Sequence, residues 1–380
     1  MTQREQMQAL LAGESLPITP QWVMAVPMAL ARELVAPAPL FQGFLESPED
    51  GAYPFSSLGE PLLTKAREFM ELIDRCAFPV GWGAAQAFGH GGPGEFNKTV
   101  IQQEANRFVV EYETGARKEV RIKPWNVHTF YLPVDSPENL EALSLPDAAE
   151  PKRYAGFRQD VAWAKAKGLW TVGWVNGFFS GVHYFLRDYA EFLMDLLAEP
   201  EFAAALVDRL GQWNLEAVRQ MCEAGVDCIG LCDDLGSEQS LLFSPELYRE
   251  FFLPWHQKLC HLVHSYGAVV HLHSHGCILP LLPDLAKAGF DILNPLDPNE
   301  NMPFDQVREL LGPKTVLCGG INKYFFEWPQ QEQREHLRQV VAQGRRHGPH
   351  ILMDSGGIPD NVSLEQFRTF LEMSREIRGQ

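Results

Sequence analysis

Short apolar runs alternate with longer helical patterns from residue 170 to the C-terminus. A short apolar run bounded by turn residues is typical of a buried strand, whereas apolar residues that recur every three or four positions indicate an amphipathic helix. Because strands that alternate with helices pair in parallel, the pattern predicts an α/β protein with a parallel sheet. The runs cover residues 170–176, 227–234, 268–275, 291–296, 315–321 and 350–357.

Two earlier runs, Gln21–Ala25 and Phe78–Ala84, bring the number of predicted strands to eight. Eight strands that alternate with helices are typical of a (β/α)8 TIM barrel. A doubly wound open sheet is the alternative, but no G-x-G-x-x-G motif follows the first strand, which disfavours it. We therefore predict a single TIM-barrel domain over residues 21–380, preceded by a helical N-terminal extension over residues 1–20.

Residues 95–150 break the alternation of strands and helices, and we expect an insertion there. Within Glu95–Tyr131 the segment F-V-V-E-Y-E-T-G-A-R-K-E-V-R-I alternates around Thr114-Gly115, which predicts a β-hairpin. Lys118, Arg121 and Lys123 make the hairpin locally basic. A solvated face is the default interpretation of these charges, and a flap over the substrate is the alternative.

Composition narrows the classes of partner and the compartment. The 380 residues carry 49 acidic and 32 basic side chains, a formal charge of −17, which disfavours nucleic acid and anionic membrane as partners. Seven cysteines form no C-x-x-C motif, the N-terminus lacks a signal-peptide core, and no apolar run reaches the length of a membrane span. We expect a cytoplasmic protein with free thiols.

Polar side chains gather where the predicted strands end, which is where barrel enzymes carry their active sites. In A-V-V-H-L-H-S-H-G-C, strand alternation projects His271, His273 and His275 to one side. His183 and Tyr184 follow the third strand. The other polar residues at strand ends are Asn176, Asp233, Asp234, Asn294, Cys318, Asn322 and Asp354.

Two kinds of chemistry suit this rim. His273 and His275 could bind zinc or a similar ion, with Asp233, Asp234 or Cys318 as third ligand, and His271 would then be structural. Alternatively the site is metal-free, and His273 or His275 is a general acid or base oriented by Asp233. We predict catalytic roles for Asp233, Asp234 and His275, and metal binding by His273, His275 and Cys318. The predicted substrate-binding residues are Asn176, His183, Tyr184, Asn294, Asn322 and Asp354.

Taken in order, several segments over residues 155–380 resemble the uroporphyrinogen decarboxylase superfamily, which includes methyltransferases that use methyl-corrinoid proteins. They are A-G-V-D-C-I-G-L-C-D-D-L-G, S-P-E-L-Y-R-E-F-F-L-P-W, H-L-H-S-H-G-C-I-L-P-L-L-P-D-L-A-K-A-G-F-D-I-L-N-P-L, L-C-G-G-I-N and S-G-G-I-P-D-N-V-S-L-E-Q-F. The resemblance implies a barrel enzyme, a zinc site in the methyltransferase branch, and a corrinoid carried by a partner protein.

The chain departs from both branches. Decarboxylases hold substrate carboxylates with an arginine-rich segment, of which only Arg32 could remain here. Their aspartate-serine pair is replaced by Asp233-Asp234, and their C-terminal histidine is replaced by Gly356. The H-x-C zinc motif of the methyltransferases aligns with His273–His275, and their distant cysteine falls near Gly357.

We therefore expect metal-assisted methyl transfer from a methyl-corrinoid protein, or demethylation. The alternatives are decarboxylation of a carboxylic acid or tetrapyrrole, and a non-catalytic barrel that binds a tetrapyrrole or corrinoid. Phe251, Phe252 and Trp255 form either a homodimer face or part of the core.

Overall fold

The fold is built on one curled parallel sheet of eight strands, consistent with a TIM barrel. The computed structural model describes residues 1–34, 57–81, 92–122 and 125–379. Every strand in this sheet pairs in parallel, in the order β1-β12-β11-β10-β9-β8-β7-β2. The strands are β1 (Gln21–Trp22), β2 (Phe78–Pro79), β7 (Thr171–Asn176), β8 (Cys228–Cys232), β9 (Val269–His273), β10 (Ile292–Leu296), β11 (Val316–Gly320) and β12 (His350–Met353).

The two edge strands of this sheet approach each other, which gives the sheet its curl. The Cys76 N–H, just before β2, donates to the Gln21 carbonyl of β1 at 2.7 Å. Inside the curl, Trp22, Trp174, Cys318 and Met353 belong to an apolar cluster that is separate from the larger core between strands and helices. A filled interior of this kind is what a TIM barrel requires.

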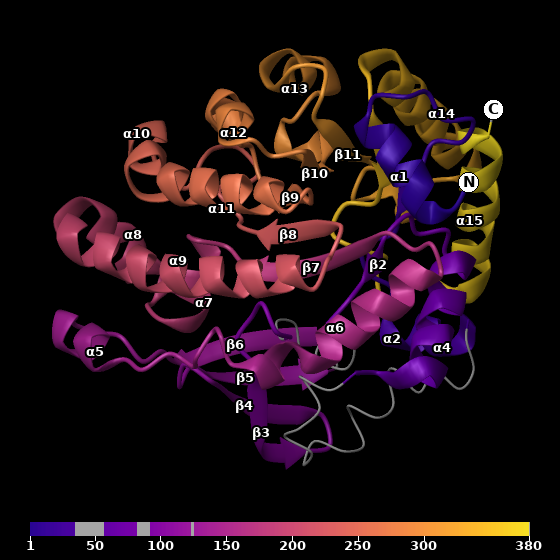
Figure 1. Ribbon diagram of the computed structural model, residues 1–380. Helices are drawn as coiled ribbons and strands as arrows, with labels where there is room; N and C mark the ends of the chain where they lie inside the picture. The colour runs from indigo at the N-terminus through magenta and orange to yellow at the C-terminus, as the bar shows by residue number, and fades with distance from the viewer. Residues whose placement is uncertain (35–56, 82–91, 123–124, 380) are drawn as a thin grey trace.

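Helices surround the sheet, as Figure 1 shows. Several begin where the sequence supplies a cap: the Asp188 carboxylate accepts from two backbone N–H groups at the start of α8, and Ser363 forms a capping box in α15. The barrel helices are α6 (Pro151–Ala166), α7 (Ser180–Phe185), α8 (Tyr189–Ala198), α9 (Pro200–Glu223), α10 (Pro245–Leu247), the π-helix η3 (Tyr248–Phe252), α11 (Leu253–Ser265), α12 (Leu282–Ala288), α13 (Phe304–Leu311), α14 (Gln330–His347) and α15 (Leu364–Arg378).

The N-terminal part adds α1 (Gln3–Leu11), α2 (Met28–Leu34) and α4 (Gly59–Leu72), and α5 (Pro137–Ala142) precedes the barrel helices. Helix α1 lies at the amino ends of the strands, because Gln3 Nε2 donates to the Arg75 carbonyl and Arg4 Nε lies 2.8 Å from Asp227 Oδ1. The opposite end of the sheet, where the strands finish, therefore stays available for a site.

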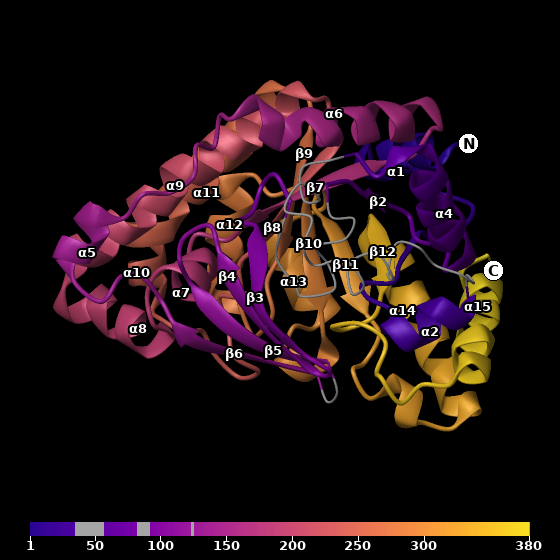
Figure 2. The same cartoon turned by 90° about the horizontal axis from the view of Figure 1, so that it is seen from below.

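A second, antiparallel sheet of four strands occupies the region where the sequence predicts a hairpin. It consists of β3 (Lys98–Glu104), β4 (Arg107–Tyr112), β5 (Arg117–Ile122) and β6 (Trp125–Tyr131), and the turn between β4 and β5 contains Gly115. Figures 1 and 2 place this sheet beside α7, and the Tyr112 ring packs 5.0 Å from Phe185 of that helix.

One expectation about exposure needs correction. Arg121 is exposed on β5, but Lys118 is only 3% exposed because its side of the sheet packs against α7; Lys123 lies outside the described residues. Phe251, Phe252 and Trp255 are buried between helices and belong to the core, which was one of the two interpretations of these residues.

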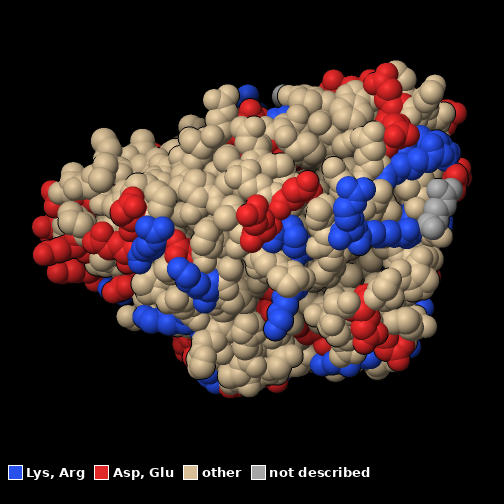
Figure 3. All heavy atoms as spheres, turned by 90° about the horizontal axis from the view of Figure 1, so that it is seen from above, with Lys and Arg blue, Asp and Glu red and all other residues tan. Residues whose placement is uncertain are grey.

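The surface and helices agree with the composition. No helix of the described residues is long and apolar enough to cross a membrane. Figure 3 shows basic side chains lying among acidic ones over much of the face seen from above, with acidic side chains gathered at one end. No extended basic surface is visible on that face.

Candidate functional site

The predicted polar rim exists, and strand register explains it. Asn176 of β7 pairs in register with Cys232 of β8, Cys232 pairs with His273 of β9, and His273 pairs with Asn294 of β10. These four residues therefore lie side by side at the carboxyl ends of β7, β8, β9 and β10. His271, two positions earlier on β9, packs its ring 5.1 Å from Trp22 inside the curl. Because alternate residues share a face, His273 also faces the interior.

A hydrogen-bonded chain fixes the tautomer of His273. His271 Nε2 donates to Asn294 Oδ1, and Asn294 Nδ2 donates to His273 Nδ1 at 3.1 Å and contacts Met353 Sδ at 3.3 Å. Burial lowers the pKa of His273, so its imidazole is neutral at pH 7. A neutral ring that accepts at Nδ1 carries its proton on Nε2. Asn294 therefore positions His273 rather than leaving it free for other partners.

His275 is the protonatable group of the rim. Its Nδ1 lies 2.8 Å from Glu300 Oε1, and the neighbouring Gly276 N–H donates to Glu300 Oε2 at 2.9 Å. Burial alone would lower the pKa of His275, but the hydrogen bond and charge of Glu300, with the charges of Asp234 and Asp297, outweigh it and raise the pKa. The His275 side chain is 31% exposed, so the imidazolium can reach a ligand.

Asp234 completes a cluster with the two histidines. Asp234 Oδ1 accepts from the His275 backbone N–H at 2.8 Å and lies 3.8 Å from His273 Nε2. The two imidazole rings are 5.0 Å apart, and 32% of the Asp234 side chain is exposed. The predicted grouping of Asp234, His273 and His275 is therefore present, and it combines an acid with a carboxylate.

Asp233 has a different environment, although it is the next residue in the chain. It is fully buried, and its carboxylate accepts from the backbone N–H groups of Phe178, Phe179 and Ser180 at 2.8–3.1 Å. His256 Nε2 lies 3.1 Å from Asp233 Oδ2, and Tyr248 Oη lies 2.8 Å from His256 Nδ1. With all its acceptor sites used, Asp233 holds the turn that begins α7 and does not face the two histidines.

His183 and Tyr184 stand on α7 at the same end of the sheet. Their rings lie 4.3 Å apart. Burial, together with the charges of Asp234 and Cys232, raises the pKa of Tyr184. The substrate-binding role of Tyr184 stays a prediction.

Two predicted substrate-binding residues keep unpaired polar atoms. Asn176 is 2% exposed, and neither polar atom of its side-chain amide has a hydrogen-bond partner among the described residues. Asp354 Oδ1 accepts from the Met24 N–H at 2.9 Å, whereas its buried Oδ2 has no partner. Burial raises the pKa of Asp354 to about 6, against its backbone hydrogen bonds and the charge of Arg75. Buried unpaired atoms in an enzyme rim are candidates for contact with a ligand.

Cys318 and Asn322 have partners other than the histidines. Cys318 is fully buried in the interior cluster with its Sγ 3.2 Å from Met353 Sδ, and burial raises the pKa of its thiol. Asn322 is engaged in its own turn, with Oδ1 accepting from the Tyr324 N–H. Among the described residues no three His, Cys, Asp or Glu side chains are placed to hold a metal. Of the three third ligands proposed from the sequence, Asp234 is the one that the structure brings beside both histidines.

Sequence reasoning missed two members of the rim. Cys232 ends β8 between Asn176 and His273, and the register of the strand would have indicated it. Glu300 lies in the loop after β10, in D-P-N-E-N, where no periodicity applies. An acidic residue in a loop that follows a rim strand is the only signal for Glu300.

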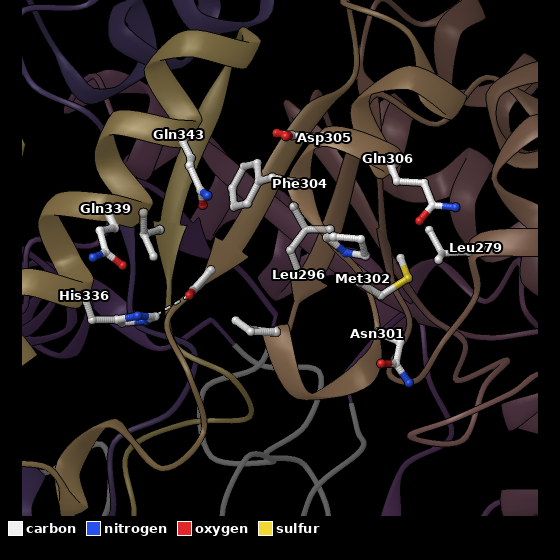
Figure 4. Close-up of a pocket in the computed structure, with 14 residues that line it drawn as sticks. Leu279, Leu296, Asn301, Met302, Phe304, Asp305, Gln306, His336, Gln339 and Gln343 are labelled. Atoms are coloured by element: carbon white, nitrogen blue, oxygen red, sulfur yellow. Dashed lines mark hydrogen bonds between the residues drawn. The ribbon is translucent and has the colours of Figure 1, made fainter.

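A separate cavity of about 600 Å³ lies outside this cluster, between the β10–α13 loop and α14. Figure 4 shows Gln306, Gln339 and Gln343 around it, with His336 bonded to the Gly320 carbonyl at one side. None of the predicted site residues lines this cavity, although its walls include Asp305 and His336 beside the three glutamines. We therefore assign the candidate site to the rim.

Comparison with known proteins identifies relatives. A model of the family described as Uroporphyrinogen decarboxylase (URO-D) matches residues 115–377. Uroporphyrinogen decarboxylases of Geobacter metallireducens and Trichlorobacter lovleyi are each 24% identical, over 62% and 49% of this chain and 69% and 52% of their own lengths. A solved methyltransferase from Methanosarcina mazei covers 99% of both chains with TM-score 0.66 and 19% identity, which shows a shared fold.

Proposed function

Because the chain belongs to the uroporphyrinogen decarboxylase family, we propose that it is an enzyme that removes a methyl group from a small substrate and passes it to a corrinoid on a partner protein. The observation that carries this proposal is the pairing of His275 with Glu300 beside Asp234, which raises the pKa of His275 and favours its protonated form. The confirmed family membership agrees with the resemblance noted from the sequence.

Loss of a methyl group from oxygen or nitrogen leaves a negative charge on that atom, so a proton donor speeds the step. In the proposed reaction the bond between the methyl carbon and the heteroatom breaks, and the heteroatom takes the proton of His275 Nε2. Asp234 stabilises the imidazolium before transfer, and the unpaired amide of Asn176 binds the substrate. The corrinoid, when bound, would supply a reduced cobalt centre that accepts the methyl group.

Zinc does not fit the ligands that the described residues bring together. The Cys318 thiol packs against Met353, and the Nδ1 atom of His273 accepts from Asn294, which leaves a proton on Nε2, where a metal would bind. We therefore assign the proton transfer to His275 and derive no step through a metal.

A second candidate, decarboxylation, is favoured by the names of the curated relatives. The same acid could protonate the carbon that loses carbon dioxide. Two features disfavour it: Gly356 stands where decarboxylases have a histidine, and Asp233, in the decarboxylases' aspartate position, has its carboxylate occupied by backbone N–H groups. The Arg32 side chain lies outside the described part of the structure.

The seven cysteines bear on the proposed location. All of them are free thiols, and five are buried. Free thiols are maintained in a reducing compartment, so we propose that the protein acts in the cytoplasm.

The test compares both reactions in one set of proteins. Purified chain is mixed with reduced cobalamin, as a stand-in methyl acceptor, and a panel of O-methyl and N-methyl compounds, and the cobalamin absorbance is followed. A parallel assay measures carbon dioxide release from uroporphyrinogen and simpler carboxylic acids. Each assay is repeated after chelation with EDTA, which should leave the rate unchanged.

We expect methyl transfer that His275→Gln lowers by roughly 10²–10⁴-fold, the usual contribution of a general acid. The matched control is His264→Gln, because His264 also pairs with a carboxylate, Asp291, but at the opposite end of the sheet. Carbon dioxide release without methyl transfer would favour the second candidate. Equal rates in the two variants would contradict the role of His275 in either reaction.

A further inference from the structure

A lysine of the antiparallel sheet is buried in a cage of aromatic rings. The Lys118 Nζ lies 5.1 Å from the ring centre of Tyr112, 5.0 Å from Tyr184 and 4.9 Å from Phe185. Tyr112 belongs to β4, and the other two rings belong to α7, so the cage joins the antiparallel sheet to the barrel. Each ring face attracts a cation, and together they define one position for the ammonium group.

The three rings present π faces to the Lys118 ammonium, and none of the three residues carries a carboxylate. Burial lowers the pKa of Lys118 to about 8, and the charge of Glu95 acts in the opposite direction. The ammonium form of Lys118 therefore still predominates at pH 7. A cation that is 3% exposed and enclosed by three aromatic rings is costly to bury, which points to an anionic ligand.

This cation adjoins the rim. Tyr184, which forms one wall of the cage, also lies within the electrostatic influence of Asp234 and Cys232. Cys232 in turn is the register partner of Asn176, whose buried amide has no partner. The cage therefore stands at the β7–β8 side of the rim, while His275 and Glu300 stand at the β9–β10 side.

We propose that Lys118 is the anchor for an anionic group of the substrate. In this arrangement an oxyanion, such as a carboxylate, pairs with the Lys118 ammonium, and the reacting end of the substrate extends toward His275. The inference rests on the proposed function only in taking the rim as the substrate site. It gives the antiparallel sheet a role in specificity, because β5 carries the anchor.

The experiment measures anion binding without turnover. Dissociation constants for acetate, malonate, methanesulfonate and inorganic phosphate, with acetamide as neutral counterpart of acetate, are measured by ligand-observed NMR. The proteins are the wild type, Lys118→Met, Lys118→Arg and Arg121→Met. Methionine keeps the apolar stem inside the cage, and arginine keeps the charge. Arg121→Met is the matched control, since it removes one positive charge from the exposed face of the same strand.

We expect at least one anion to bind the wild type more tightly than acetamide. Lys118→Met should raise its dissociation constant roughly tenfold, equivalent to about 1.4 kcal/mol. Lys118→Arg should stay within about threefold, as expected for a charge-assisted contact that tolerates either cation. Arg121→Met should match the wild type. Comparison of the dissociation constants for the carboxylates, the sulfonate and phosphate identifies which oxyanion the site prefers.

Unchanged anion affinity in Lys118→Met, or equal affinity for acetate and acetamide, would overturn the proposal. If Lys118→Met fails to fold, as judged by circular dichroism, the comparison of acetate with acetamide on the wild type and on Lys118→Arg still decides it. Anion binding without any methyl transfer would remove the proposed function and leave the anchor. Methyl transfer at the same rate in the wild type and in Lys118→Met would support the proposed function and remove the anchor.

Discussion

Replacing Asp233 by asparagine separates a positioning role from a catalytic one. Asp233 Oδ1 accepts from the N–H groups of Phe179 at 3.0 Å and Ser180 at 2.8 Å, while Oδ2 accepts from Phe178 at 3.1 Å and faces His256 Nε2 at 3.1 Å. An amide has only one acceptor atom. In either orientation its NH2 group meets donors where the wild type has an acceptor, and the charge that strengthens the remaining bonds is lost.

The cost follows from the bonds lost. A hydrogen bond to a charged group contributes about 1.5–3 kcal/mol, so losing two would lower the free energy of unfolding by about 3–6 kcal/mol. The lower part of that range is expected, because His256 can change tautomer: its Nε2 then accepts from the new amide, and the Tyr248 hydroxyl accepts from Nδ1. Even about 3 kcal/mol is a large share of the 5–15 kcal/mol typical of a domain.

Denaturant unfolding of Asp233→Asn, with Asp234→Asn as matched control, measures the loss in the free energy of unfolding. Asp234 is one-third exposed, and an asparagine oxygen can still accept from the His275 N–H. We expect Asp234→Asn to lose less than about 1 kcal/mol of stability while losing activity. The reasoning is refuted if Asp233→Asn unfolds at the wild-type midpoint yet is inactive, because Asp233 would then act in chemistry rather than in holding α7.

Two pH-dependent predictions concern the other rim carboxylates. Glu300→Gln removes the charge that raises the pKa of His275, so the alkaline limb of the pH–activity profile should move to lower pH. The stability that the His275–Glu300 ion pair adds is fully present below pH 6.5 and is lost as the pH rises through the raised pKa. An alkaline limb at the wild-type pH would contradict the assignment. Asp354 has a pKa of about 6 in the folded state against 3.8 ordinarily, so wild-type stability should fall from about pH 4 to pH 6, whereas Asp354→Asn should lack this slope in unfolding midpoints measured across that range.

The barrel and the grouping of its rim residues were predictable from the sequence. Strand ends were visible as apolar runs that finish in polar residues, and parallel strands bring those ends to one edge. Asp234, His273 and His275 were therefore expected together, as the structure has them. Glu300 was missed because its loop carries no periodic signal. Cys318, one strand beyond Asn294, belongs to the interior cluster, where its thiol packs against Met353, and the sequence does not indicate this packing.

The burial of Lys118 could not be predicted from the sequence for a different reason. Alternation along β5 indicates two faces but not which of them is covered, and a charged residue in a hairpin is exposed by default. Only the packing of the antiparallel sheet against α7 reveals that the Lys118 face is the buried one. Tertiary contact between an insertion and a barrel helix leaves no mark in local sequence, so this candidate residue required the structure.

The opposite environments of Asp233 and Asp234 follow from strand geometry. Cys232 faces the interior, as the register partner of His273, and Asp233 still continues the strand because its N–H donates to the His273 carbonyl at 2.8 Å. Alternation then turns Asp233 outward, to α7 and to His256 of α11, and returns Asp234 to the rim. A paired D-D at the end of a buried strand therefore predicts one structural and one functional carboxylate, and the parity of its neighbours in the strand decides which is which.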